Sequence, residues 1–279
     1  MQALPSYIHL HETGELAERI ETAWAILRDC TLCPWHSHVN RLEGERGVCR
    51  VGSLPMVSNS GPHFGEERPL VGRRGSGTIF LTWCNLRCVF CQSYDISHFG
   101  AGEEVTVEEL GEMMVSLWRR GCHNINFVTP SHQVAQILAA LPYAIEMGVN
   151  LPLVYNCGGY EEVATLRLLE RIFDIYMPDL KYGESEIARR YSGAPRYVET
   201  VKSALMEMHR QVGTLVLDEG GIAVRGVLIR HLVLPVGLAG TRQVMRFIAR
   251  KLSPDSYVNI MDQYNPCFKA VAPPPEPAD

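Results

Sequence analysis

Segments with strand-like composition alternate with segments of helical periodicity from residue 78 to residue 268. The strand-like runs are rich in β-branched and aromatic residues. They cover residues 78–83, 124–129, 151–156, 173–177, 223–234 and 257–261. Alternation of this kind is typical of a parallel sheet with right-handed helical crossovers. We therefore expect an α/β fold built from six βα units.

Several helices carry recognisable terminal signals. Thr106 and Glu109 have the spacing of a capping box, and Gly121 stands where that helix is expected to end. Thr13 is a candidate N-cap for a helix that runs to Asp29, and Ser131 is a candidate N-cap for the helix after the second strand. A further helix is expected over residues 160–172.

The chain divides into three parts by pattern. Residues 1–77 are predicted to form a helix, a cysteine-containing segment and a long ordered loop over 50–77, all packed on the core. Residues 78–268 form the βα core. Residues 269–279, which include a run of three prolines, are predicted to be a disordered tail.

Composition and charge exclude several classes of protein. The 279 residues include 26 basic and 31 acidic side chains, so no basic field favours nucleic acid. The sequence shows neither a secretion signal nor an apolar run long enough to cross a bilayer, and we expect a cytoplasmic protein without a membrane partner. In that compartment the nine cysteines favour metal or redox chemistry over disulfides.

Three cysteines, Cys84, Cys88 and Cys91, follow the first strand with the spacing C-x3-C-x2-C. Three thiolates can hold a four-iron cluster that lacks its fourth protein ligand. The open iron is then available to the amino and carboxylate groups of S-adenosylmethionine (SAM), a cofactor whose radical chemistry no side chain provides. A zinc site or a set of buried thiols is the alternative.

The cysteine loop resembles the signature of the radical SAM superfamily, with Phe90 as the aromatic residue before the third cysteine. Residues 62–67 and 75–80 further resemble the branch related to the pyruvate formate-lyase activating enzyme. The resemblance covers about residues 30–268. It implies a partial, open (β/α)6 TIM-like barrel and an oxidoreductase with a [4Fe-4S] cluster on the three cysteines. It also implies reductive cleavage of SAM to a 5′-deoxyadenosyl radical that abstracts hydrogen from a substrate.

Polar residues at the carboxyl ends of the strands are candidate contacts to SAM, since active sites of βα barrels lie there. Met177, Asp179 and Lys181 match a Met-x-Asp-x-Lys pattern of the family, in which the aspartate and lysine position the cofactor. His132, which follows the second strand, is a candidate substrate or cofactor contact. The complete set of predicted SAM-binding residues is Phe90, Thr129, Ser131, Asn156, Asp179 and Lys181.

The resemblance also suggests partners. A radical SAM enzyme requires a reductant such as flavodoxin or ferredoxin, and the activating-enzyme branch acts on a glycyl residue of a partner enzyme. Radical modification of a small metabolite, peptide or nucleic acid is the alternative. A scaffold that keeps its metal but has lost catalysis is a second alternative.

A second cysteine group lies nearer the N-terminus. Cys30 and Cys33 form a C-x2-C pair, and Cys49 follows after a loop that contains His36 and His38. This set is able to close a zinc site or hold a second cluster. Relatives carry a further cysteine near the position of Ser37. Either a histidine replaces that thiolate, or the remaining cysteines are structural.

Overall fold

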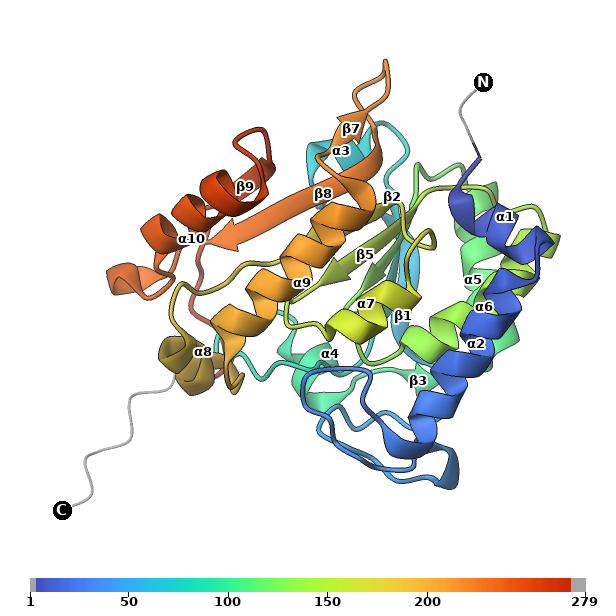
Figure 1. Ribbon diagram of the computed structural model, residues 1–279, viewed down its shortest axis with the longest axis horizontal. Coiled ribbons are helices and arrows are strands. Elements are labelled where there is room, and N and C mark those ends of the chain that lie inside the picture. Colours follow the sequence, from blue (N-terminus) through green and yellow to red (C-terminus); the bar gives the residue numbers. More distant parts are fainter. Residues whose placement is uncertain (1–3, 272–279) are drawn as a thin grey trace.

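The computed structural model describes residues 4–271, which form one large open sheet surrounded by helices (Figure 1). Strands β2, β4, β5, β6 and β8 are neighbours in that order and run parallel, and β9 pairs in parallel with β8. Their bounds are Ser76–Leu81, Ile125–Val128, Leu153–Cys157, Ile175–Pro178, Ala223–Leu232 and Tyr257–Met261. The six predicted strands are confirmed, and the open sheet agrees with a partial TIM-like barrel.

The sheet extends beyond the six parallel strands. Strand β1 (Met56–His63) pairs antiparallel with β2 and carries the short β3 (Glu103–Glu104), while β7 (Val216–Leu217) pairs antiparallel with β8. The prediction of a loop over 50–77 was therefore wrong for β1. Its sequence, Met-Val-Ser-Asn-Ser-Gly-Pro-His, is poor in strand formers, and pairing with the buried β2 stabilises it instead.

The helices pack around the sheet (Figure 1). Helices α2, α6 and α5 pack side by side, and α9 packs on β6 and β8. The described helices are α1 (Ser6–Glu12), α2 (Glu15–Ile26), α3 (Arg68–Val71), α4 (Tyr94–Phe99), α5 (Val107–Arg119), α6 (Val134–Glu146), α7 (Val163–Leu168), α8 (Ser185–Ser192), α9 (Tyr197–Val212) and α10 (Thr241–Phe247). Of the helix predicted over 160–172, only the central part, α7, is helical.

Two predicted N-caps were wrong. Helix α2 begins at Glu15 after Gly14, whose φ of 83° suits glycine, and Thr13 instead caps the C-terminus of α1. Helix α6 begins at Val134, and the hydroxyl of Ser131 donates to the buried carboxylate of Glu161. The Ser131 hydroxyl therefore bonds to a buried carboxylate and not to the backbone at the start of α6.

The capping box of α5 is confirmed and gives a stability prediction. Thr106 Oγ1 accepts from Glu109 N at 3.1 Å, and Glu109 Oε2 accepts from Thr106 N at 2.7 Å. Thr106→Ala removes the first of these bonds, and we expect the free energy of unfolding in urea to fall by about 1 kcal/mol. Thr22→Ala, in the middle of α2, is the control and is expected to be neutral or slightly stabilising. Equal effects would contradict the cap.

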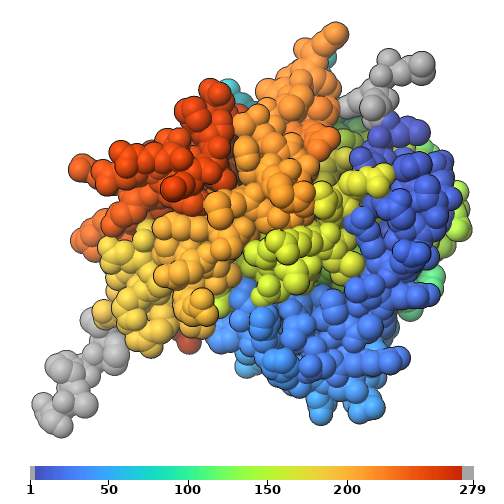
Figure 2. All heavy atoms as spheres, in the orientation of Figure 1, coloured from blue at the N-terminus to red at the C-terminus, as the bar shows by residue number. Residues whose placement is uncertain are grey.

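The N-terminal segment lies against the βα core (Figure 2). Trp35 Nε1 donates to Asn85 O at 2.6 Å, and Thr165 Oγ1 donates to Leu32 O at 2.9 Å. The division of the chain at residues 77 and 268 stays a prediction. Of the predicted disordered tail, residues 269 and 270 belong to a short 3-10 turn, Phe268–Ala270, and residues 272–279 lie outside the described residues. No helix of the described part is long and apolar enough to cross a membrane.

Candidate functional site

One cavity lies at the carboxyl ends of β2, β4, β5 and β6, beside the loop that follows β2. Parallel strands bring their carboxyl ends to the same edge, so residues far apart in sequence meet there. The predicted residues that line this cavity are Cys84, Cys88, Cys91, Thr129, Asn156, Asp179 and Lys181. Arg230 of β8, a charged residue within an apolar strand, lines it as well.

Each of the three cysteine sulfurs in this cavity has a hydrogen-bonding neighbour. The pairs are Leu86 N with Cys84 Sγ at 3.3 Å, Ser192 Oγ with Cys88 Sγ at 2.9 Å, and Ser97 Oγ with Cys91 Sγ at 3.1 Å. Donors directed at thiolates stabilise their charge and tune the potential of a bound iron–sulfur group. The set therefore suits three metal-bound thiolates.

Burial disfavours the deprotonated thiolate form of these cysteines when no metal is bound. It raises the pKa of Cys84 to about 12 and also raises the pKa of Cys88, although Lys181 opposes both shifts. A bound metal offsets this cost, because coordination deprotonates a thiol. In residues 4–271 no three His, Cys, Asp or Glu side chains are placed to hold a single metal ion. Three thiols that line one cavity match the number of protein ligands of a four-iron cluster with one open iron.

A network of buried charges also lines the cavity. Asp179 accepts from Lys181 Nζ at 2.5 Å and from Arg230 Nε at 2.7 Å. Arg230 also donates to Asn156 Oδ1 at 2.8 Å and lies 3.5 Å from Glu66 Oε2. Burial would raise the pKa of Asp179, but the two cations hold it below its usual value. Asp179 is therefore an anion that orients two cations.

Glu66 was not among the predicted site residues. It lies between β1 and β2, and its side chain is 8% exposed. Burial raises its pKa to about 7 against the attraction of Arg230. It falls within residues 62–67, which resemble the activating-enzyme branch, but its contact with Arg230 joins positions more than 160 residues apart and depends on the fold. Ser192 was missed for the same reason, since it reaches Cys88 across 104 positions.

Two residues at this edge have unusual backbone geometry. Trp83 after β2 and Thr129 after β4 both have a φ of 62°. A β-branched residue such as Thr129 seldom adopts this conformation, and strained residues cluster at functional sites. The Thr129 amide donates to Asn156 O at 2.8 Å, which holds the turn in place.

Two predicted SAM contacts lie apart from the residues that line the cavity. The ring of Phe90 packs edgewise on Tyr182 and Tyr264, with centroids 6.4 and 6.2 Å away. Ser131 is fully buried and donates to Glu161 Oε1 at 2.5 Å. His132 lines a different cavity, described below.

Glu161 gives a prediction about pH. It accepts from Ser131 and from Tyr155, yet burial dominates and raises its pKa from 4.5 to about 7. The folded state therefore binds this proton more tightly than the unfolded state, and stability falls as the pH rises from about 4.5 to 7. Glu161→Gln is expected to flatten this fall in urea-unfolding curves recorded across the window. An unchanged slope would show that the carboxyl does not titrate there.

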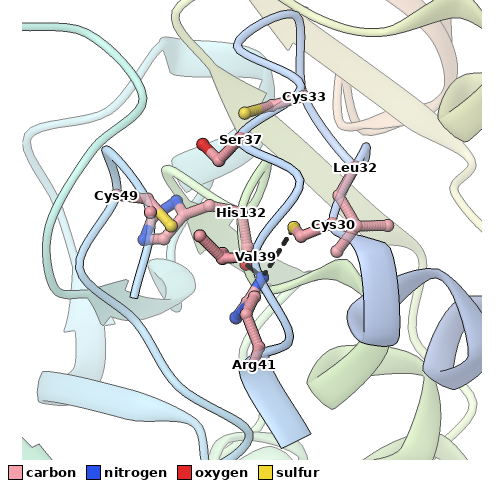
Figure 3. A pocket seen from close by; sticks show the side chains of 9 residues that line it. Cys30, Leu32, Cys33, Ser37, Val39, Arg41, Cys49 and His132 are labelled. Carbon is pink, nitrogen blue, oxygen red and sulfur yellow. Dashed lines mark hydrogen bonds between the residues drawn. The ribbon is translucent and has the colours of Figure 1, made fainter. Parts of the chain in front are cut away.

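The second cysteine group surrounds a small cavity of its own (Figure 3). Cys30, Cys33 and Cys49 line it, as do Ser37 and His132. The two histidines expected to supply a fourth ligand point elsewhere. The ring of His36 lies 2.7 Å from Glu162, and the ring of His38 lies 2.8 Å from Asp29.

Comparison with known proteins gives matches in sequence and in structure. The model of the Radical SAM superfamily matches residues 78–218. An uncharacterized protein of Methanocaldococcus jannaschii is 34% identical over 262 residues, which cover 90% of this chain and 70% of that protein.

Two solved structures are among the structural matches. One is native anSMEcpe with bound AdoMet and Cp18Cys peptide, which is 11% identical over 65% of this chain, with a TM-score of 0.45. The other is TYW1 with a lysine-pyruvate adduct bound, which is 12% identical over 62% of this chain, with a TM-score of 0.41. The matches span 48% and 61% of those two chains.

Proposed function

Because the chain belongs to the radical SAM superfamily, we propose that it cleaves SAM reductively at a [4Fe-4S] cluster held by Cys84, Cys88 and Cys91. The observation that carries this proposal is the convergence of the three cysteines with Asp179 and Lys181 on one cavity. These residues come from two segments that lie about 90 positions apart in the chain, and a purely structural thiol group would need no such charged wall.

The side chains have distinct roles in this proposal. The three thiolates bind the cluster and leave one iron without a protein ligand. The ammonium of Lys181 and the guanidinium of Arg230 provide positive charge for the SAM carboxylate, and Asp179 keeps both cations in place. When bound, the cluster and SAM supply a 5′-deoxyadenosyl radical. Buried side chains around the cavity limit the access of water to that radical.

An anaerobic product assay tests this function. The purified protein is reconstituted with iron and sulfide and incubated with dithionite and SAM. We expect 5′-deoxyadenosine and methionine in equal amounts. A fully loaded cluster that yields neither product would favour a non-catalytic scaffold.

We propose further that the hydrogen donor is a glycyl residue of a partner enzyme. Support comes from residues 62–67 and 75–80, which resemble the activating-enzyme branch. Asp179 and Lys181 of the Met-x-Asp-x-Lys pattern also lie together in the cavity. A flavodoxin or ferredoxin is the proposed reductant. Incubation with glycyl-radical enzymes is expected to give a protein-centred doublet in electron paramagnetic resonance (EPR). Without that signal, peptides and metabolites are the substrates to screen.

A further inference from the structure

The small cavity near the N-terminus is lined by groups that bind metals. The sulfurs of Cys30, Cys33 and Cys49 face it from different sides, and the Ser37 hydroxyl lies between two of them (Figure 3). All three cysteines are buried, with 7% exposure each. No disulfide joins any of them. Three free thiols around one void are more than ordinary packing requires.

Arg41 places a buried positive charge beside these sulfurs. Its side chain is fully buried and donates to Gly52 O at 2.8 Å, to His132 O at 2.8 Å and to Cys30 Sγ at 3.8 Å. Among the described residues no carboxylate lies within ion-pair distance of it. An uncompensated buried charge is costly. Thiolates in this cavity would supply the missing negative charge.

His132 presents an unprotonated nitrogen at the same place. Its Nε2 lies 2.8 Å from Thr82 O, and a carbonyl only accepts, so Nε2 carries the proton. Nδ1 is buried and has no partner among the described residues, so a proton there would be an unpaired buried donor; the ring is therefore neutral, with a lone pair on Nδ1. Fixing one nitrogen on a carbonyl is how proteins orient a ligating histidine.

We propose that Cys30, Cys33 and Cys49 hold a second iron–sulfur cluster, with His132 as its fourth ligand. Thiolate-rich sets select iron–sulfur clusters or zinc. Zinc and a four-iron cluster both take four such ligands, so the measured metal content decides between them. This proposal is independent of the function proposed for the first cysteine loop.

The two cysteine groups are close neighbours in the fold. Thr82, whose carbonyl contacts His132, stands two residues before Cys84. Trp35, two residues after Cys33, donates to the carbonyl of Asn85, which follows Cys84. The signals of two centres this close are expected to overlap, so the second centre is measured in a variant that lacks the first.

A variant without the first cysteine set isolates the second centre. In the full chain with Cys84→Ala, Cys88→Ala and Cys91→Ala, anaerobic reconstitution is expected to leave about four iron and four sulfide per chain, half the wild-type content. Adding Cys30→Ala to the triple variant is expected to remove the remaining iron and sulfide. Adding Cys122→Ala instead, at a cysteine outside both cavities, is expected to leave the iron and sulfide content unchanged. Far-ultraviolet circular dichroism checks that each variant is folded.

Wild-type protein gives a measurement that needs no variant. About eight iron and eight sulfide per chain support the second cluster, and about four of each overturn it. One zinc per chain in addition to four iron would also overturn the cluster. His132→Ala is expected to change the EPR spectrum of the centre that remains in the triple variant. An unchanged spectrum there would remove His132 from the ligand set.

Discussion

Replacing any one of Cys84, Cys88 and Cys91 with alanine is expected to reduce 5′-deoxyadenosine formation to background. A cluster with one open iron has only three protein ligands, so each of the three is indispensable. Loss of any sulfur also leaves the hydrogen-bond donor beside it without its acceptor. The product is quantified by liquid chromatography after anaerobic reconstitution, together with the iron content of each variant.

Cys122→Ala provides the matched control for these three variants. Cys122 is 3% exposed and lies outside both cysteine cavities, so it tests the loss of a buried thiol as such. Its product yield is expected to match the wild type. Substantial activity in any of the three loop variants would show that the loop does not hold the catalytic cluster.

The second large effect is expected at Asp179. Its side chain is 16% exposed and accepts from both Lys181 and Arg230. Asp179→Asn keeps the shape but leaves two buried cations with reduced compensation, and we expect the free energy of unfolding to fall by about 3 to 5 kcal/mol. Equilibrium unfolding in urea measures this change. The affinity for SAM, measured by equilibrium dialysis, is expected to fall as the cations lose their orientation.

Glu186→Gln is the control for Asp179→Asn. It removes a carboxylate from the exposed pair with Arg189 on α8, where solvent screens the interaction, and little change in stability is expected. If both substitutions left stability unchanged, the charges around Asp179 would be solvated and the wall of the cavity would be more open than the structure shows.

The features that the sequence predicted are those set by local pattern. Strand composition placed the six parallel strands, and Thr106 placed the start of α5. The spacing of the cysteine loop identified the metal-binding candidates, and parallel strands then explain why Asn156 and Asp179 meet that loop. At these positions the structure favoured by the local sequence is the same as the one required by the sheet topology, so the local pattern was sufficient to predict it.

The features that the sequence missed depend on contacts between distant segments. Strand β1 is stabilised by its partner rather than by its own residues. Glu66 and Arg230 meet only when the sheet has formed, and Ser192 reaches Cys88 from another helix. His132 was a candidate substrate or cofactor contact, but its ring lines the N-terminal cavity, where its Nε2 contacts Thr82 O.

The most direct test of the account is whether SAM coordinates the open iron. SAM labelled with nitrogen-15 at its amino group is added to the reduced, reconstituted protein, and electron–nuclear double resonance is recorded on the cluster signal. We expect a hyperfine coupling from the labelled nitrogen, which is lost when SAM is omitted. A full cluster on Cys84, Cys88 and Cys91 that shows no such coupling, or zinc in place of iron at these cysteines, would contradict the central claim.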